Sequence, residues 1–252
     1  MKTKLIILTV AFFVSMAQEL FAWGSTEHEA ITFIAECNLN PKAKKRIESY
    51  LGGHSIVYYA TWMDGVRKMP EYSFSDTWHM GVVDENFKCV EERCIPELEK
   101  IIEKLENYKT LDDSTLAVNL KFLIHLVADM HCPSHVIYTN LLTSFNVIYI
   151  GEDRSYHSVW DDAMMRHAHA WSYTEYQHQL DRCSVKEKKQ IMQGNPREWF
   201  EQSAKDCIII YEWAKPGDKL DFNFIYRAHT LGENQMVKAG YRLAYLLNKL
   251  FG

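Results

Sequence analysis

Long apolar runs are missing from this 252-residue sequence. The longest, Leu5 to Val14 with Thr9 inside it, is far shorter than the about 20 apolar residues that a membrane-spanning helix needs. A basic excess is missing too, because 28 Lys and Arg stand against 33 Asp and Glu, which gives a formal net charge of −5. These absences exclude an integral membrane protein and argue against one that holds nucleic acid through a broad basic face. Any phosphate-bearing partner would have to be bound locally.

Segments rich in Pro, Gly or Ser are also missing, as are blocks of like charge and internal repeats, so one domain is the simplest expectation. With 47% hydrophobic and 24% charged residues, the chain can bury a full core. From Thr26 onward apolar residues recur three and four apart, which predicts a mainly helical fold with at most a short β-hairpin. The expected strand covers residues 146–150, which are rich in β-branched and aromatic residues. The expected helices cover residues 26–37, 41–51, 54–67, 95–107, 114–131, 156–170, 172–182, 184–192, 196–213 and 234–250.

The N-terminus has the layout of a secretory signal peptide. Lys2 and Lys4 precede the apolar run, and small residues follow it. The tripeptide ending at Ala17 has the better small-x-small pattern, but we expect cleavage after Ala22, because this frees the amine of Trp23 for a role given below. Residues 1–22 are then the signal peptide, residues 23–252 the mature domain, and its formal charge is −6. The mature protein is expected to be secreted or periplasmic.

Six cysteines in an exported chain raise the question of disulfide bonds. Cys89 and Cys94 enclose four residues of a segment that we expect to be a loop, so a bridge between them and two separate thiols are both compatible with the sequence. The others lie in or beside helical patterns and are expected to be small buried hydrophobic residues: Cys37, Cys132, Cys183 and Cys207.

Two His-x-x-x-Asp pairs occur at helical spacing. His125 and Asp129 share one face of a helix whose other positions are apolar, and His135 follows just past the end of that helix. His157 and Asp161 repeat the spacing on a second helix. Such a pair alone is most often a histidine hydrogen-bonded to a carboxylate. Together with His135, however, the two pairs suit zinc, which binds imidazole nitrogen and carboxylate oxygen.

Further motifs give the chain a family resemblance. The mature terminus reads Trp-Gly-Ser-Thr-Glu-His (23–28), residues 62–67 read Trp-Met-Asp-Gly-Val-Arg, and residues 76–79 read Asp-Thr-Trp-His. With the two His-x-x-x-Asp pairs, this order resembles that of the zinc-dependent single-strand nucleases of fungi and plants, which are related to bacterial zinc phospholipases C. The resemblance extends from Trp23 to Asn248, essentially the whole mature chain. It implies the mainly helical zinc phospholipase C/nuclease type of fold.

The resemblance implies three zinc ions and nine ligands, all of the expected residue types. Asp64, His79, His125 and Asp129 would bind the first ion; His135, His157 and Asp161 the second; Trp23, through its free amine and carbonyl, with His28 and a shared Asp129, the third. Only cleavage after Ala22 provides that amine. The resemblance also implies that Arg67 lies near the scissile phosphate, and that Asp64 orients the attacking water as well as binding zinc.

The function implied is that of an exported trinuclear-zinc phosphodiesterase, an endonuclease on single-stranded RNA or DNA with activity on 3′-nucleotides. Three divalent ions would concentrate positive charge in an acidic chain. The alternatives are a zinc phospholipase C and a non-catalytic metal-binding relative. Asp161, where the related phospholipases tend to have Glu, favours the nuclease. The expected partner is single-stranded nucleic acid or a nucleotide as substrate, and no stable protein partner is inferred.

Some positions depart from the family pattern. Leu141-Leu142-Thr143 replaces a usual Gly-Gly-Asn turn, and the acidic residue after His79 comes late, at Asp84. Base recognition is therefore the family property that the resemblance supports least for this chain. Met80 and Leu142 could make the site apolar enough for a lipid phosphodiester. His131 would project away from the ligand face and is expected behind the ligands. The remaining histidines are expected to be surface or hydrogen-bonded residues: His54, His167, His169, His178 and His229.

Overall fold

The computed structural model describes residues 23–90 and 93–252. The predicted signal peptide, residues 1–22, lies outside them. The longer helices of the described part are α1 (Ser25–Cys37), α2 (Pro41–Tyr50), α4 (Cys94–Glu106), α5 (Asp113–Asp129), α8 (Tyr173–Leu180), α9 (Val185–Ile191), α10 (Pro196–Cys207) and α12 (Phe222–Phe251). The shorter ones are η1 (Ile56–Tyr59), α3 (Trp62–Val66), η2 (Ser73–Ser75), η3 (Tyr108–Thr110), η4 (Pro133–His135), α6 (Tyr156–Ser158), η5 (Val159–Ala163), α7 (Met164–His169) and α11 (Ile210–Trp213). The predicted mainly helical class is confirmed.

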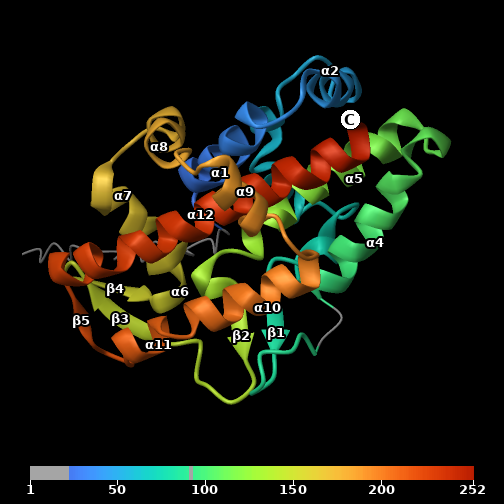
Figure 1. Ribbon diagram of the computed structural model, residues 1–252. Helices are drawn as coiled ribbons and strands as arrows, with labels where there is room; N and C mark the ends of the chain where they lie inside the picture. Colours follow the sequence, from blue (N-terminus) through green and yellow to red (C-terminus); the bar gives the residue numbers. More distant parts are fainter. Residues whose placement is uncertain (1–22, 91–92) are drawn as a thin grey trace, which may run out of the picture.

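Helix α12 is the longest element and crosses the molecule diagonally (Figure 1). It packs against α1, α2, α5 and α7, and its inner face includes Met236, Ala239, Leu243 and Leu247. Helix α10 runs below it in the view of Figure 1, near the small strands. No helix within the described ranges is both long and apolar enough to cross a membrane.

Two small sheets accompany the helices, which is more β-structure than the single short hairpin expected. β1 (Gly81–Val83) pairs in parallel with β2 (Val136–Tyr138). β3 (Asn146–Tyr149) pairs antiparallel with β4 (Glu152–Ser155) and in parallel with β5 (Lys219–Leu220). The β3–β4 turn has positive φ at Ile150 (50°) and Gly151 (85°), as a two-residue type I′ hairpin requires. The predicted strand 146–150 is β3.

Three predicted helices differ from the observed ones in ways that matter for the site. The predicted helix 54–67 is divided into η1 and α3, and the predicted helix 156–170 contains the π-helical turn η5. Single π turns occur often at functional sites. The third, α12, begins at Phe222 rather than at residue 234, because the side chain of Asp221 caps it by accepting from the backbone N–H groups of Asn223 and Phe224.

The cysteines are not joined as disulfides, so the Cys89–Cys94 bridge considered above is not formed. Cys94 is the first residue of α4 and its side chain is buried in the core. Cys89 lies on the other side of residues 91–92 and forms an isolated β-bridge with Val83. Cys89 is partly buried and packs against the same hydrophobic core, but the two thiols are not bonded. Cys132 and Cys207 are buried, as expected for small hydrophobic residues, whereas Cys37 is exposed.

Candidate metal centre

Helix α5 supplies the two central side chains of a buried cluster of histidines and aspartates. The side chain of Asp112 caps its N-terminus by accepting a hydrogen bond from the backbone N–H of Thr115. From Phe122 onward the helix is buried on all sides. His125 and Asp129 lie one turn apart on the same face and are both fully buried. Polar groups at such depth need partners that replace the water they lose.

Four donor atoms from α3, α5 and the loop after η2 converge at this face. Asp129 Oδ2 lies 2.8 Å from His79 Nδ1 and 3.1 Å from His125 Nε2. Asp64 Oδ1 lies 3.8 and 3.7 Å from the same two nitrogens, which are 3.3 Å apart. Ligands at about 2.0 to 2.2 Å from a tetrahedral zinc ion are separated from one another by about 3.3 to 3.6 Å. The four donors therefore fit one zinc ion.

A second group of donors forms where η4 meets α6 and η5. His135 Nε2 lies 3.0 Å from Asp161 Oδ1, and His157 Nε2 lies 2.9 Å from Asp161 Oδ2. The two imidazole rings are stacked, with centroids 5.0 Å apart. The π turn η5 carries Asp161, and each oxygen of its carboxylate faces the Nε2 atom of one ring. Two imidazoles and one carboxylate are donors that zinc accepts.

The start of the described chain lies beside both groups. The indole N–H of Trp23 donates to the carbonyl oxygen of Ala128, which neighbours Asp129, and the backbone N–H of Gly24 donates to the carbonyl oxygen of Asp161. His28, on the first turns of α1, stacks on His125 with ring centroids 4.1 Å apart. Its Nε2 lies 3.4 Å from Asp129 Oδ1. The backbone at Trp23 and Gly24 and the His28 ring thus border the same interior space.

Asp129 lies between the groups, and its two oxygens face different neighbours. Oδ2 faces His79 and His125, as described above, whereas Oδ1 lies 3.4 Å from His28 Nε2 and 3.4 Å from His135 Nδ1. The side chain is fully buried. A carboxylate placed in this way can serve two metal ions at once.

Several donor atoms in the cluster are buried but have no hydrogen-bond partner within the described part of the chain. They are both ring nitrogens of His28, Asp64 Oδ1, His79 Nε2, Asp129 Oδ1, His135 Nδ1 and Asp161 Oδ2. An unpaired buried polar atom costs about 1–3 kcal/mol, so a concentration of them at one place calls for a compensating ligand. Divalent cations satisfy this donor set.

The cluster also perturbs its own titration. Burial alone would lower the pKa of His125, but the carboxylates of Asp129 and Asp64 raise it to about 9. Burial opposes ionisation of Asp129, yet His125 and His135 hold the pKa of its carboxyl well below the usual range. Without metal, the protonated His125 imidazole therefore lies beside the ionised carboxylate of Asp129. Cations bound there would replace protons.

A backbone contact orients the central histidine. His125 Nδ1 donates to the carbonyl oxygen of Ala60, 2.9 Å away, in the short connection between η1 and α3. This hydrogen bond leaves Nε2 as the ring nitrogen directed at Asp64, His79 and Asp129. Such contacts behind a ligand commonly fix its tautomer and ring orientation. The break in the predicted helix 54–67 provides the carbonyl group.

Other residues singled out in the sequence have different surroundings. Arg67, at the end of α3, forms an ion pair with Asp76, with Nε 3.7 Å from Oδ1. Asp84 accepts hydrogen bonds from the backbone N–H groups of Asn86 and Lys88, so its carboxylate closes a turn. His131 lies behind the ligands, where its Nε2 is 2.8 Å from Arg242 Nη1.

Two features of the molecule were not expected. Cys132 Sγ lies 3.3 Å from Asp161 Oδ1, and the hydroxyl of Ser134 lies 3.4 Å from the same oxygen. Their position between the proposed ligands Asp129 and His135 could have indicated in the sequence that both residues lie at the site. Moreover, His169, expected to be a surface or hydrogen-bonded residue, has a carboxylate partner in Glu233.

Taken together, the mainly helical fold and the buried His and Asp donors define a helical protein with an interior site suited to divalent metal ions. The family model of the S1/P1 nucleases matches residues 23–252. The chain belongs to this family of phosphodiester-hydrolysing nucleases, and the resemblance seen in the sequence is confirmed.

Known nucleases are similar to this chain in sequence, in agreement with the family match. Nuclease S1 of Aspergillus oryzae is 27% identical over 175 aligned positions, and the match covers 61% of this chain and 58% of that protein. Endonuclease 2 of Arabidopsis thaliana is 25% identical over 284 aligned positions, and the match covers 98% of this chain and 97% of that protein. Nuclease P1 of Penicillium citrinum is 24% identical over 269 aligned positions, and the match covers 91% of this chain and 98% of that protein. The match to nuclease S1 is therefore partial, whereas the other two extend over nearly both chains.

Proposed function

We propose that this chain is an exported phosphodiesterase with three zinc ions that cleaves single-stranded RNA or DNA and also acts on 3′-nucleotides. The observation that carries the proposal is the sharing of Asp129. Its Oδ2 belongs to one group of donors, and its Oδ1 faces His28 and His135 of two others. One carboxylate thus joins three groups of donors into one centre, as a multinuclear site requires.

The proposed ligands follow these groups. Asp64, His79, His125 and Asp129 would hold the first zinc ion; His135, His157 and Asp161 the second; the amine and carbonyl of Trp23 with His28 and Asp129 the third. The anchoring of Trp23 and Gly24 beside Ala128 and Asp161 supports the terminal ligand, because it fixes the backbone of the mature N-terminus next to the cluster. Zinc ions bound there would lower the pKa of water and neutralise charge on the phosphoryl group.

The chain's own residues would orient the reactants. Asp64 lies beside His79 and His125, so the oxygen of its carboxylate that does not bind zinc would accept a hydrogen bond from an attacking water. Arg67 lies one turn further along at the end of α3, where a planar guanidinium suits two phosphate oxygens. Its ion pair with Asp76 holds the guanidinium in place, and the carboxylate is partly exposed. A substrate phosphate would compete with Asp76 for Arg67.

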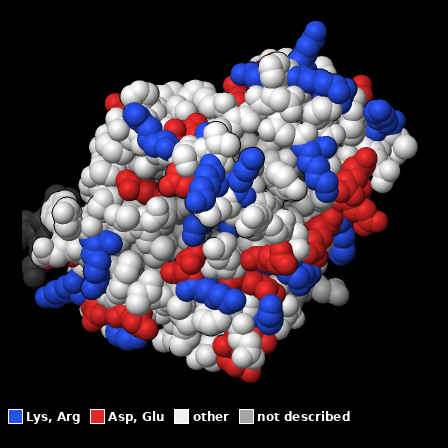
Figure 2. All heavy atoms as spheres, in the orientation of Figure 1, with Lys and Arg blue, Asp and Glu red and all other residues white. Residues whose placement is uncertain are grey.

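Aromatic side chains beside the site favour nucleic acid as the substrate. Phe74 is 55% exposed and packs edge-on against Trp78, which directly precedes the proposed ligand His79. Exposed aromatic rings let single-stranded bases stack without base-specific contacts. By contrast, Lys and Arg are interspersed with Asp and Glu on the face shown in Figure 2. Attraction to phosphate would therefore come from the metal centre rather than from that face.

One observation favours the phospholipase alternative. Leu142, in the loop that replaces the Gly-Gly-Asn turn, is 65% exposed, and this loop follows β2, which comes directly after His135. An exposed apolar residue near the centre could contact a lipid. The two aromatic residues beside His79, Phe74 and Trp78, form a larger apolar surface than Leu142 alone. We therefore propose nucleic acid rather than a phospholipid as the substrate.

The test is hydrolysis by the zinc-loaded mature chain, beginning at Trp23, of single-stranded RNA, single-stranded DNA, duplex DNA, a 3′-nucleotide and phosphatidylcholine. We expect cleavage of both single strands and release of phosphate from the 3′-nucleotide, with slower cleavage of the duplex. Asp64→Asn serves as the inactive control. Selective hydrolysis of phosphatidylcholine would support the phospholipase alternative, and loss of all activities in the fully loaded protein would support the non-catalytic one.

Export is tested separately, by N-terminal sequencing of the protein recovered outside the cytoplasm. A chain beginning with Trp23 is expected. A chain beginning with Gln18 would mean cleavage after Ala17 and would remove the proposed terminal ligand.

A further inference from the structure

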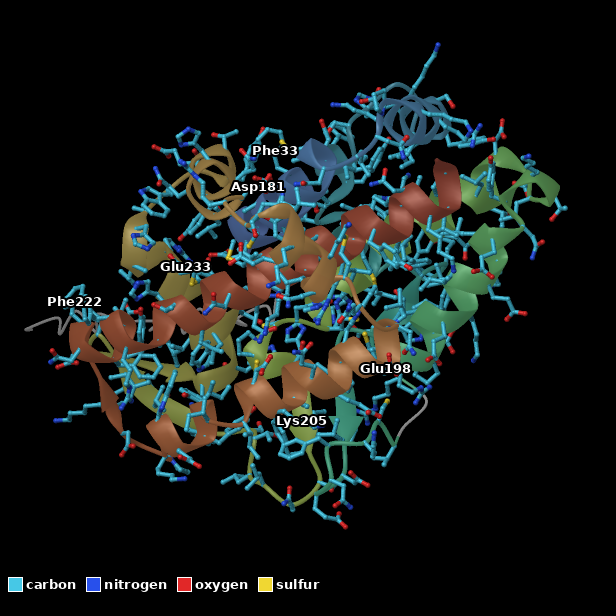
Figure 3. The ribbon with its side chains drawn as sticks, viewed as in Figure 1. Phe33, Asp181, Glu198, Lys205, Phe222 and Glu233 are labelled. Atoms are coloured by element: carbon cyan, nitrogen blue, oxygen red, sulfur yellow. The ribbon has the colours of Figure 1, made fainter. Side chains whose placement is uncertain are left out.

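Another group of side chains of the types that bind metal ions lies away from the nine proposed ligands. His169 ends α7, and His229 and Glu233 lie on α12, neither of which supplies any of the nine. One ligand atom from each lies within 4.8 Å of the other two. The three residues are partly exposed, unlike the core of the main centre. Figure 3 shows Glu233 on α12 where that helix passes α7.

The spacing on α12 directs two of these donors to one side. His229 and Glu233 are four residues apart, which places them on the same face of the helix. His229 Nδ1 donates to the backbone carbonyl oxygen of Ile225 at 3.1 Å. The hydrogen therefore lies on Nδ1, and Nε2 carries a lone pair, as a histidine ligand requires.

His169 is held in position by its neighbours. Its ring stacks on Trp171 with centroids 3.8 Å apart and an angle of 7° between the planes. The residue between them, Ala170, has a φ of 53°, and this left-handed conformation turns the chain at the end of α7. His169 Nε2 lies 2.8 Å from Glu233 Oε1. The imidazole is therefore already directed at the carboxylate from the other helix.

A plain His–Glu hydrogen bond explains part of this arrangement. It does not explain why His229 converges on the same point, with its ring centroid 5.3 Å from that of His169 and its Nδ1 already bonded to the backbone. Two imidazoles and one carboxylate suit zinc and similar transition metals, whereas magnesium and calcium prefer oxygen ligands.

We propose that His169, His229 and Glu233 form an additional binding site for a zinc-like divalent cation, which joins the end of α7 to α12. Three protein ligands and partial exposure leave coordination positions to water. The site therefore binds more weakly than the main centre and exchanges its ion readily. Because the ion binds only the folded arrangement of the two helices, it stabilises the fold by mass action.

The test is a calorimetric titration of the zinc-loaded mature protein, freed of loosely held metal by dialysis, with zinc chloride in a buffer that does not bind zinc. Wild-type protein is expected to take up one further ion per chain. His229→Ala and Glu233→Gln should each weaken this binding by about tenfold or more. His178→Ala, an exposed histidine of α8, is the matched control and should titrate as wild type does.

Two further measurements keep the outcome clear. Zinc should raise the midpoint of thermal unfolding in the wild type and in His178→Ala but not in Glu233→Gln, whose side chain has nearly the same shape as that of glutamate. Hydrolysis by all three variants should equal that of the wild type. Absence of an additional ion in the wild type, or unchanged uptake by both His229→Ala and Glu233→Gln, would overturn the site. Because the comparison is between variants, it holds whatever the main centre binds.

Discussion

At the scale of single residues, Asp129 has the largest consequences. It is fully buried, and four histidines from three other segments and its own helix lie around its two oxygens. Replacing it by Asn keeps the volume but removes the charge that both sides of the centre share. Loss of a residue behind a metal ligand typically costs 10–100-fold, so loss of Asp129, the proposed ligand to two ions, should cost about 100-fold or more in hydrolysis.

His131→Ala is the matched control for Asp129→Asn. His131 is equally buried, but its Nδ1 donates to the Val127 carbonyl oxygen and its Nε2 faces Arg242. Its loss leaves buried groups unpaired and should cost about 1–3 kcal/mol of the free energy of unfolding, with kcat within about tenfold of wild type. The two variants are compared by steady-state hydrolysis at a temperature where both are folded. Equal losses of activity in the two variants would contradict the assignment of Asp129 as a ligand and of His131 as a residue behind the ligands.

Zinc binding should release protons, because the pKa of His125 is about 9 in the metal-free cluster and that of His135 is raised well above its usual value. At pH 7 both imidazoles then carry a proton that the ligand must lose. Apparent affinity should therefore fall as pH is lowered below about 9, by about tenfold per pH unit for each proton displaced. Calorimetry in buffers of different ionisation enthalpy counts the protons. Binding at pH 7 without proton release would contradict this description of the cluster.

Residue type and spacing pointed to the two His-x-x-x-Asp pairs in the sequence, whereas the family resemblance implied the other proposed ligands. His125 and Asp129, or His157 and Asp161, share a face at four-residue spacing wherever the helix lies. The partners of His169 could not be recognised in this way. His169 and Glu233 are far apart in the sequence, and only the packing of α7 against α12 brings them within 2.8 Å.

At the scale of elements, the departures from helical periodicity lie beside the centre. The sequence 156–170 has the apolar pattern of one helix, and the pattern does not reveal that Val159–Ala163 forms a π turn. The start of α12 was missed because polar residues and Gly232 interrupt the pattern before residue 234. Gly232 lies close to Met165, and a β-carbon at residue 232 would be only 2.8 Å from Met165 Sδ.

The contact between α1 and α12 positions His28, and Gly240 permits it. A β-carbon at residue 240 would lie 2.5 and 2.8 Å from Ile34 side-chain atoms and 3.2 Å from the Ile31 carbonyl oxygen. Gly240→Ala should therefore destabilise the protein by about 1–3 kcal/mol in denaturant unfolding, although alanine favours helix by about 1 kcal/mol. In Gly232→Ala, the matched control, the new methyl group meets a flexible methionine and should cost less. A more stable Gly240→Ala would show that the two helices do not need this close approach.

At the scale of the whole molecule, the proposed catalysis depends on export, because removal of the signal peptide would create the terminal amine of Trp23. The family match begins at residue 23, the residue at which the predicted mature chain begins, and the cleavage itself remains a prediction. One extra residue before Trp23 would convert the terminal amine into an amide, a very poor ligand at neutral pH. The fold, built from residues further along the chain, should be unchanged. We expect such a chain to lose most of its hydrolytic activity.

The most direct test is the zinc content of two folded chains after exhaustive dialysis, one beginning at Trp23 and one a residue longer, with both termini verified by mass spectrometry. Dialysis removes the loosely held ion of the additional site. The account predicts about three tightly bound zinc ions in the first chain and about two in the second. One ion or none in the first chain, or equal contents in the two, would contradict the three-zinc centre with Trp23 as its terminal ligand.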